Sequence, residues 1–339
     1  MDQGPAADAP VEPTEDAQEL YQDLEKAILG SARTLNRVQV AERAGVPLER
    51  AMALWRALGF PSSGSDEEVL FVEADIEALR RVAWLVDSGF IDVGVELTLV
   101  RSMGRSFARL AEWEISELTA ATLARKTAPG PDDLRELVDQ LMPVVEDIHE
   151  YIWRRHIASA AGRSLLRAGS TGEGVEMAVG FADIVGFTRR SKAMTAGELA
   201  HLVEVFESTA ASIVTEHGGR VIKSIGAEIL FVADAPGAAG RIGLALVEAQ
   251  QRDADFPDLR IGLAYGPVLP RLGDVFGPVV NIASRLTSVA RRGRVLIDRD
   301  LHTLLKPRED EFRVRRGRTT TVRGYSRLDT WTLRRPRTG

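Results

Sequence analysis

Three short segments in the C-terminal half of this chain carry the side chains that could do chemistry. The first, Phe-Ala-Asp-Ile-Val-Gly-Phe-Thr, places Asp183 between an apolar run and a turn that contains glycine. A carboxylate at a strand end can hold a hard cation beside phosphate oxygens. The backbone N–H groups that follow can bind the same oxygens as an anion-binding turn, and they belong to Ile184, Val185, Gly186, Phe187 and Thr188. Alone, an aspartate in this position would be interpreted as the cap of the next helix.

The other two segments add a lysine and an asparagine–arginine pair. Lys-Ser-Ile-Gly-Ala-Glu places Lys223 four residues before Ala227, and a single lysine on a strand is usually a solvated edge residue. Asp-Val-Phe-Gly-Pro-Val-Val-Asn-Ile-Ala-Ser-Arg begins at Asp274 and contains Asn281 and Arg285, which are four residues apart and share one face of a helix. An amide and a guanidinium on one face suit phosphoryl chemistry, but by themselves they identify no function.

The three segments together resemble the class III nucleotidyl cyclases, which convert ATP or GTP to the 3′,5′-cyclic nucleotide. The resemblance covers about residues 176–334 and rests on whole strings rather than on single residues. These strings are Phe-x-Asp-Ile-x-Gly-Phe-Thr, Gly-Gly-x-x-x-Lys-x-x-Gly and Asp-x-x-Gly-x-x-Val-Asn-x-Ala-x-Arg. The resemblance therefore implies a cyclase domain in this half of the chain.

The resemblance implies a role for each residue that would contact the nucleotide. Lys223 would donate a hydrogen bond to the adenine ring, and Asp274 would accept one from the exocyclic amine. Family members that use GTP typically carry Glu and Cys at these positions, so the Lys–Asp pair favours ATP. Asn281 would position the ribose, and Arg285 would neutralise the charge that builds on the α-phosphate during attack by the 3′-hydroxyl. Arg323, in Val-Arg-Gly-Tyr, falls where the family often has a lysine that binds the terminal phosphates.

The resemblance also implies metal ions and a second copy of the chain. In the family, the aspartate at the position of Asp183 binds both catalytic metal ions, which are Mg²⁺ or Mn²⁺. The metal-binding residues face the purine-binding and transition-state residues across a dimer interface. One chain contains both half-sites, so we expect a head-to-tail homodimer with two composite active sites.

Ala227 departs from the family, whose second metal-binding aspartate belongs at this position. Two-metal catalysis needs anionic oxygen ligands for cations about 3.5–4 Å apart. Glu228 is the adjacent carboxylate, but neighbours on a strand point to opposite faces, so we do not expect it to replace the missing ligand. Because the other motif positions are intact, we interpret Ala227 as an introduced substitution that impairs an active cyclase. The alternative is an inactive nucleotide-binding regulatory module. Two metal ions per active site are expected only with Ala227→Asp.

A frame of strands and helices must position these side chains, and the apolar pattern of the C-terminal half predicts one. We expect buried strands at 176–183, 220–225, 229–233, 259–265 and 294–297, and helices at 196–217, 236–251 and 279–291. The order β-α-β-β-α-β is that of a ferredoxin-like fold, an antiparallel sheet with helices on one face. The chain is therefore predicted to be α+β, with the catalytic domain over residues 176–339.

The N-terminal half predicts helices with few strands. We expect a disordered acidic tail at 1–17, an all-α regulatory domain at 18–150, and a connecting helix and linker at 151–175. Within these, one long helix is expected over 132–167, after a break at 128–131. A helical region joined to a cyclase domain resembles the autoinhibitory domains of actinobacterial cyclases, some of which respond to pH.

One segment of this half, Val38–Phe60, resembles the helix-turn-helix of a DNA-binding domain, and Gly45 supports that shape. The region is not basic, whereas a DNA reader should carry a cationic face. We therefore prefer a helical hairpin in a bundle and expect no nucleic acid partner. A DNA-binding protein with the C-terminal domain as its sensor is the third alternative.

Composition and charge bound the remaining possibilities. A net charge of −6 offers no general attraction to nucleic acid or acidic membranes, and the absence of cysteine excludes disulfides and thiolate catalysis. No apolar run of about 18 residues exists, so we expect a cytoplasmic protein without stable membrane insertion. His149 and His156 are candidate proton sensors, although ordinary surface histidines would look the same. The apolar helices could also enclose a lipid-like ligand.

Overall fold

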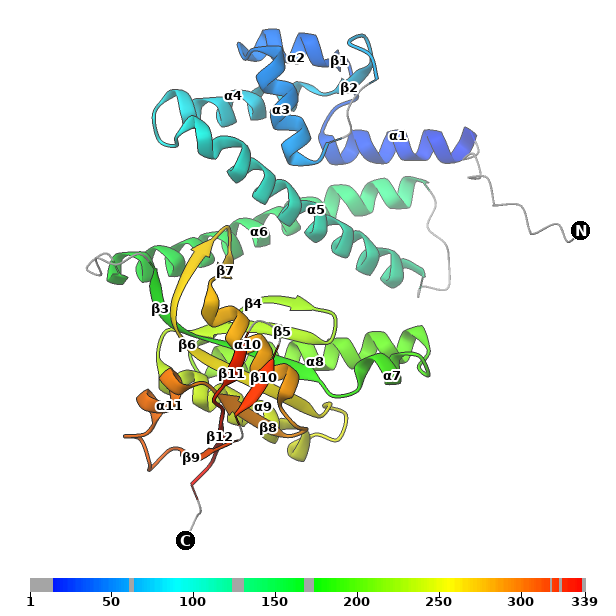
Figure 1. Cartoon of the computed structure of the whole chain (residues 1–339). Helices are drawn as coiled ribbons and strands as arrows, with labels where there is room; N and C mark the ends of the chain where they lie inside the picture. The colour runs from blue at the N-terminus through cyan, green and yellow to red at the C-terminus, as the bar shows by residue number, and fades with distance from the viewer. Residues whose placement is uncertain are drawn as a thin grey trace, which may run out of the picture. The chain divides into compact units, whose positions relative to one another are not determined.

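The computed structural model describes residues 15–60, 64–123, 131–167, 174–317, 319–322 and 325–336. The chain divides into two compact units, Met1–Ala168 and Gly169–Gly339, which are treated one at a time (Figure 1). Of the tail expected to be disordered, residues 1–14 lie outside the described residues, and the first helix begins at Glu15. None of the helices within the described ranges is long and apolar enough to cross a membrane.

The N-terminal unit contains a helix–turn–helix. α2 (Arg37–Ala44) and α3 (Leu48–Leu58) are separated by a turn at Gly45, whose φ of +72° lies in the left-handed region that favours glycine. Asn36 caps α2, since its side chain accepts a hydrogen bond from the Gln39 N–H at 2.9 Å. The Gln39 side chain in turn accepts from the Asn36 N–H at 3.0 Å. The two helices joined by a turn, which both interpretations of Val38–Phe60 predict, are confirmed.

A short antiparallel ribbon makes the N-terminal unit slightly different from the expected all-α domain. β1 (Leu35–Asn36) pairs with β2 (Val69–Phe71), and α4 (Glu73–Asp87) packs on α2. Buried apolar side chains from these elements form the core of the unit: Leu35, Val40, Ala51, Leu54, Trp55, Phe71, Ile76, Leu79 and Ala83. The ribbon closes over this core, so the unit is helical with one small β element.

Two long helices complete the N-terminal unit. α5 (Val93–Leu123) packs on α3, and α6 (Pro131–Arg167) packs on α1 (Glu15–Leu29). α6 agrees with the long helix predicted over 132–167. Most of the predicted break at 128–131 lies outside the described residues.

Ion pairs join these helices to one another. Arg50 of α3 binds Glu96 of α5 at 2.6 Å and Asp87 of α4 at 3.1 Å, so its charge is compensated within the fold. The hydrogen bond from Arg50 to Glu96 is the main cause that raises the pKa of Arg50. His149 Nε2 of α6 lies 2.6 Å from Glu114 Oε1 of α5. Of the two predicted sensor histidines, the structure therefore gives His149 a charged partner on another helix.

A mixed β-sheet forms the centre of the C-terminal unit (Figure 1). The strands follow one another across the sheet as β4, β5, β3, β6, β8, β12 and β9, and β7 pairs with β6 at its side. Their bounds are β3 Val175–Ile184, β4 Gly219–Ile225, β5 Glu228–Ala233, β6 Leu259–Arg271, β7 Asp274–Phe276, β8 Arg294–Ile297, β9 Arg313–Arg316 and β12 Trp331–Arg334. The five predicted strands are confirmed, but β6 and β8 run parallel, so the sheet is not purely antiparallel.

Helices cover both faces of this sheet rather than one. Their bounds are α7 Phe187–Ser191, α8 Ala196–Glu216, α9 Pro236–Arg252, α10 Pro278–Val289 and α11 Arg299–Leu305. Because side chains alternate along a strand, β3 contributes to two apolar layers. Ala182 and Ile184 lie in the layer under α8, α9 and α11, whereas Val179 and Phe181 lie in the layer under α10. A separate ribbon, β10 (Thr320–Val322) with β11 (Tyr325–Leu328), lies outside the sheet.

A glycine lets α10 approach the sheet closely. A Cβ atom at Gly262 of β6 would lie 2.3 Å from the Thr287 backbone nitrogen and 2.4 Å from the Ala283 carbonyl oxygen. The Thr287 hydroxyl also donates to the Phe181 carbonyl of β3 at 3.3 Å. α10 is therefore held against β3 and β6. This contact also sets the positions of Asn281 and Arg285, the two motif residues on α10.

Candidate active site

Asp183 lies at the end of β3, between an acidic and a basic residue of the neighbouring strands. In the antiparallel register it stands opposite Glu228 of β5 and opposite Arg260 of β6. The Arg260 Nε donates to Asp183 Oδ2 at 2.6 Å, and its Nη1 donates to the Ser288 carbonyl at 3.2 Å. The guanidinium therefore connects the carboxylate to the C-terminal end of α10.

Glu228 faces Asp183, which corrects the expectation that it points away from the site. Residues opposite each other in an antiparallel ladder point to the same face. Ala227 lies in the turn before β5, so strand alternation counted from it does not apply. Burial, followed by the negative charge of Asp183, raises the pKa of Glu228 to about 7, whereas the charge of Arg260 lowers it.

The pair of metal ions that the resemblance implies does not fit this chain. Asp183 Oδ2 is bound by Arg260, and position 227 offers only a methyl group, which packs against the apolar layer under α8 and α9. Among the residues with described placement, no group of three or more His, Asp or Glu side chains could hold a metal ion. Asp183 and Glu228 supply too few ligands for two hard cations, which each prefer about six oxygens.

The turn after Asp183 offers fewer free amides than the sequence suggested. The Ile184 N–H donates to the Ala227 carbonyl, and the Val185 N–H donates to the Asp258 carbonyl, both at 2.9 Å. Ile184 is buried in the layer under α8, and Phe187 packs against that layer. Gly186, with a φ of +72°, precedes α7, which contains Phe187 and Thr188. The amides from 186 to 188 are left as the candidates for binding an anion.

The structure brings Lys223 and Asp274 together, from β4 and β7. Lys223 Nζ donates to Asp274 Oδ2 in an ion pair, and Asp274 Oδ1 accepts from the Val275 N–H at 2.8 Å. Lys223 stands opposite Leu230 of β5, whose side chain belongs to the layer under α10. The pair therefore lies on the same face of the sheet as α10, and both side chains stay partly exposed.

Asn281 and Arg285 lie one turn apart on α10, as their spacing predicts. Asn281 is exposed and Arg285 is half-buried. Neither side chain has a hydrogen bond or ion pair to another residue in the part of the chain that the structure describes. Arg323, the predicted contact for the terminal phosphates, lies outside the described residues.

The predicted site residues form two groups at opposite ends of α10. Asp274 lies just before the helix begins, whereas Arg260 ties Asp183 to Ser288 near its end. The helix has 12 residues and is about 18 Å long. One copy of the chain thus holds both the group around Asp183 and the Lys223–Asp274 pair, separated by roughly the length of this helix.

Two residues of the acidic group, Glu228 and Arg260, were not predicted from the sequence. Arg260 is the only charged residue in the apolar run of 259–265, which is a signal that the sequence does contain. Its partner, however, depends on the register between β3 and β6, which no local pattern specifies. The same register places Glu228 opposite Asp183.

Comparison with known proteins agrees with this geometry. Residues 172–335 match the family model described as the adenylate and guanylate cyclase catalytic domain. The chain is 43% identical over 303 residues to an adenylate cyclase of Streptomyces coelicolor, covering 88% of this chain and 78% of the relative. It is 41% identical over 296 residues to an adenylate cyclase of Streptomyces griseus, covering 86% and 73%. It is 36% identical over 342 residues to an adenylate cyclase of Glutamicibacter nicotianae, covering 96% and 84%.

These relatives extend across the helical N-terminal unit as well as the catalytic domain, because the matched regions are longer than residues 172–335. The motif strings, the paired strands that carry them and the identity over most of both chains lead to one family. The chain belongs to the class III nucleotidyl cyclases, among relatives named adenylate cyclases.

Proposed function

We propose that residues 176–339 form an ATP-binding cyclase domain whose reaction yields 3′,5′-cyclic AMP and pyrophosphate. The observation that carries this proposal is the ion pair between Lys223 and Asp274. A protonated amine and a carboxylate held side by side match a ring-nitrogen acceptor and the exocyclic amine donor of adenine. The relatives named adenylate cyclases support the same substrate.

The chemistry assigned to α10 follows from its two polar residues. The ribose 3′-hydroxyl loses its proton to solvent, and its oxygen attacks the α-phosphorus. One P–O bond forms, the bond from the α-phosphorus to the oxygen of the β-phosphate breaks, and pyrophosphate leaves. Arg285 has no ion pair to another described residue and can stabilise the charge on the α-phosphate oxygens. Asn281, one turn earlier, can hold the ribose hydroxyls in position. The phosphate tail would lie along the amides from Gly186 to Thr188.

We propose that the active form is a head-to-tail homodimer with two composite sites. Within one copy, Asp183 and the Lys223–Asp274 pair lie at opposite ends of α10. A second copy related by a twofold axis would bring the acidic end of one helix to the purine-binding end of the other. This arrangement would unite the two groups over a single nucleotide.

The surface of α6 supports a second copy. Apolar and small residues, interrupted by Arg155, recur at alternating spacings of three and four along it, and we call this set the α6 seam: Leu141, Val144, Ile148, Tyr151, Arg155, Ala158, Gly162 and Leu165. Such spacing is typical of helices that pair with a partner helix. Four of these side chains are strongly exposed, at 53% for Val144, 50% for Ile148, 65% for Tyr151 and 77% for Leu165. Two α6 helices in parallel would bury them together.

We further propose that Ala227 lowers turnover while leaving nucleotide binding largely intact. The side chains that would contact purine, ribose and α-phosphate are present, whereas the second anionic metal ligand is missing. An introduced substitution explains why only the metal-binding aspartate at position 227 is missing, whereas the other motif residues are present. The inactive regulatory module remains the competing explanation for the same residue.

The decisive experiment is a cyclic AMP assay on the chain and on Ala227→Asp, with Mg²⁺ or Mn²⁺ present. We expect the new carboxylate to raise the rate by orders of magnitude, because anionic ligands are what two-metal sites need. Ala227→Asn is the matched control, since it has nearly the same size but no charge. Equal rates for all three proteins would reject the cyclase proposal and favour the regulatory module.

We propose that the N-terminal unit controls the approach of the two copies. α6 carries the α6 seam and ends at Arg167, shortly before the catalytic unit begins. The contact between His149 and Glu114 joins α5 to α6 and becomes an ion pair when the imidazole is charged. A proton and a lipid-like ligand are the two candidate signals. Cyclase assays of Ala227→Asp over about pH 5.5–8, with and without residues 1–168, would reveal such control.

A further inference from the structure

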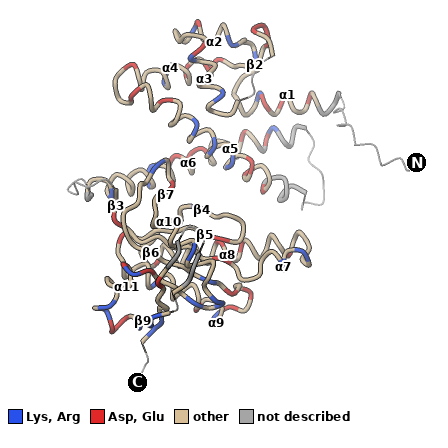
Figure 2. Tube along the Cα trace, in the orientation of Figure 1, with Lys and Arg blue, Asp and Glu red and all other residues tan. Residues whose placement is uncertain are grey.

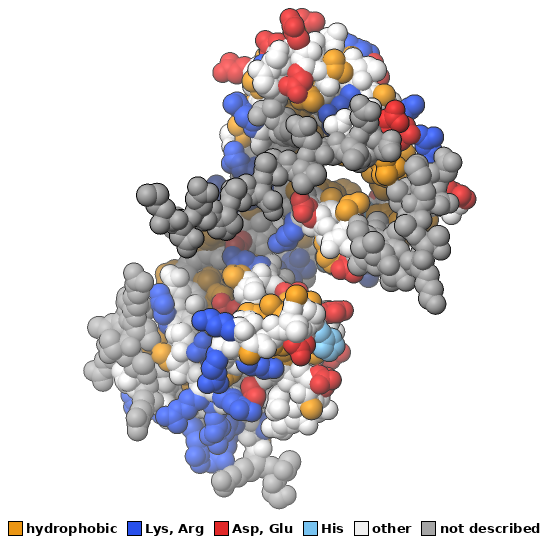
Figure 3. Space-filling view, turned by 90° about the vertical axis from the view of Figure 1, so that its right-hand side faces the viewer, with side chains coloured by type: hydrophobic (Ala, Val, Ile, Leu, Met, Phe, Trp, Pro, Cys, Tyr) orange, Lys and Arg blue, Asp and Glu red, His pale blue; other side chains and the backbone are white. Residues whose placement is uncertain are grey.

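Arginines occupy neighbouring positions on four adjacent strands, starting beside Asp183. Arg260 of β6 is in register with Arg294 of β8, and Arg334 of β12 is in register with Arg313 of β9. Because Leu333 pairs with Val295 in the antiparallel ladder, Arg334 comes opposite Arg294. Figure 2 shows basic residues at β9, and Figure 3 shows Lys and Arg side chains gathered over one side of the C-terminal unit.

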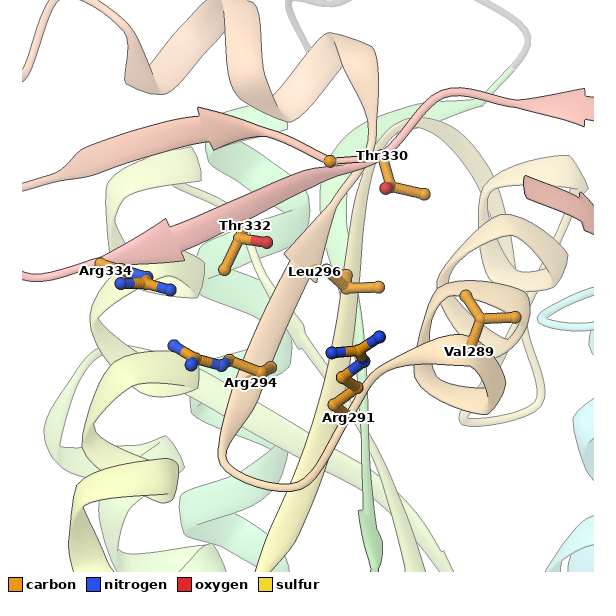
Figure 4. Close-up of a pocket in the computed structure, with 8 residues that line it drawn as sticks. Val289, Arg291, Arg294, Leu296, Thr330, Thr332 and Arg334 are labelled. Atoms are coloured by element: carbon orange, nitrogen blue, oxygen red, sulfur yellow. The ribbon is translucent and has the colours of Figure 1, made fainter. Parts of the chain in front are cut away.

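Part of this row opens into a pocket with a volume of about 450 Å³. Three arginines line this pocket: Arg291, which follows α10, Arg294 on β8 and Arg334 on β12. Arg294 and Arg334 belong to the row, whereas Arg291 does not. Figure 4 shows their guanidinium groups around the same hollow, with Thr332 beside them. The remaining lining residues are Val289, Leu296, Gly317 and Thr330. Among the residues with described placement, no acidic side chain lines the pocket.

Unlike two arginines close to them in the sequence, the arginines of the pocket have no acidic partner among the residues that the structure describes. Arg292 binds Asp258 at 2.6 Å, and Arg299 binds Asp329 at 2.7 Å. In contrast, Arg291, Arg294 and Arg334 have no ion pair to any residue that the structure describes. The Nε of Arg334 is moreover buried without a hydrogen-bond partner among those residues.

We propose that this pocket, which we call the arginine pocket, binds an oligophosphate anion such as pyrophosphate, separately from the nucleotide site. Three guanidinium groups offer forked donors that match phosphate oxygens, and one anion with several charged oxygens can satisfy them together. The volume exceeds the need of a single phosphate, which favours a di- or triphosphate. Thr332 adds a hydroxyl donor. The site itself does not depend on the proposed cyclase reaction.

The test is titration of the full chain with pyrophosphate by calorimetry and by thermal unfolding. We expect binding that weakens as salt rises and an increase in Tm, because the anion binds only the folded state. Arg294→Gln and Arg291→Gln should each weaken pyrophosphate binding about tenfold or more, the effect of losing one charged hydrogen bond. Arg292→Gln, in the same loop but outside the pocket, is the matched control. Equal affinity for all four proteins would overturn the proposal.

Further arms separate the arginine pocket from the nucleotide site and identify the source of the anion. Pyrophosphate binding should persist in Arg285→Gln; loss there, with retention in Arg294→Gln, would place the anion in the nucleotide site and reject the proposal. Competition by ATP against pyrophosphate in Lys223→Met would assign the pocket to nucleotide phosphate tails. Absence of competition would assign it to free oligophosphate. Failure of the cyclase assay would leave these binding results unchanged.

Discussion

Asp183 binds Arg260 of the neighbouring strand β6, and Asp274 of β7 binds Lys223 of β4, a strand with which β7 is not paired. Each ion pair is partly exposed, so its contribution to folding is expected to be small. Its importance lies in holding the charged groups at fixed positions before a ligand arrives. The residue types could be predicted from sequence because they occur in specific strings. The partner of Asp183 could not, because it lies 77 positions away along the chain.

A buried carboxyl group away from the site gives a residue-scale prediction about pH. Asp298 caps α11, with one oxygen accepting from the Leu301 N–H at 2.9 Å and the other from the Tyr265 N–H at 3.3 Å. Burial raises its pKa to about 7, against the opposing effect of these hydrogen bonds. The folded protein therefore keeps this proton when the unfolded chain has lost it, so this group makes stability fall as pH rises from about 4 to about 7.

We expect Asp298→Asn to remove that dependence while keeping an oxygen acceptor for the Leu301 N–H. Relative to the unsubstituted protein, the free energy of unfolding of the variant should rise between pH 4 and pH 8, by at most roughly 3–4 kcal/mol. Urea denaturation at both pH values measures it. A difference between the proteins that does not change with pH would show that Asp298 ionises normally in the fold.

At the scale of elements, apolar periodicity predicted the strands well because both faces of β3 are buried. Met177, Val179 and Phe181 alternate with residues of the opposite layer, which gives a continuous apolar run. The prediction of helices on one face of the sheet was wrong for α10, because an amphipathic helix packs equally well on either face. Glu228 was misplaced for a related reason, since the turn at Ala227 shifts the alternation on which the prediction depended.

The contact between α10 and β6 gives an element-scale prediction. Gly262→Ala would place a methyl group 2.3 Å from the Thr287 backbone nitrogen, so α10 must move. We expect a loss of stability of about 1–3 kcal/mol, typical of overpacking. Weaker ATP binding should accompany it, because α10 carries Asn281 and Arg285.

Gly197→Ala is the control, because a Cβ there meets nothing within 4 Å and the residue lies in helix α8. This substitution should be neutral or stabilise the protein by up to about 1 kcal/mol. Chemical denaturation and calorimetry with ATP measure both effects. If Gly262→Ala behaves like Gly197→Ala, α10 does not need this close approach.

At the scale of the whole molecule, the exposed α6 seam and the divided site both favour two copies of the chain. Ile148→Asp would introduce a charge into the centre of the α6 seam, whereas Trp153→Asp changes another side of the same helix. The two side chains are comparably exposed, at 50% and 59%. We expect Ile148→Asp to weaken self-association at least tenfold, because a buried unpaired charge is costly, and Trp153→Asp to leave it unchanged.

Sedimentation equilibrium over a range of protein concentrations measures the self-association of these variants. Equal effects of the two substitutions would indicate that α6 does not pair along the α6 seam. The sequence contained this seam, but its spacing alone could not distinguish a partner helix of the same chain from one of a second copy. The exposure of these side chains in the folded unit favours a second copy.

The ion pair between Lys223 and Asp274 has a consequence for substrate discrimination. In the free protein the two groups satisfy each other, so any base that enters must first separate them. This cost is the same for every nucleotide, but only a base with an acceptor and a donor at the matching positions recovers it through two new hydrogen bonds. In the proposed nucleotide site, a mismatched base would thus be disfavoured because it does not recover this cost. Selectivity at this position would arise from competition with an internal partner as much as from attraction to the correct base.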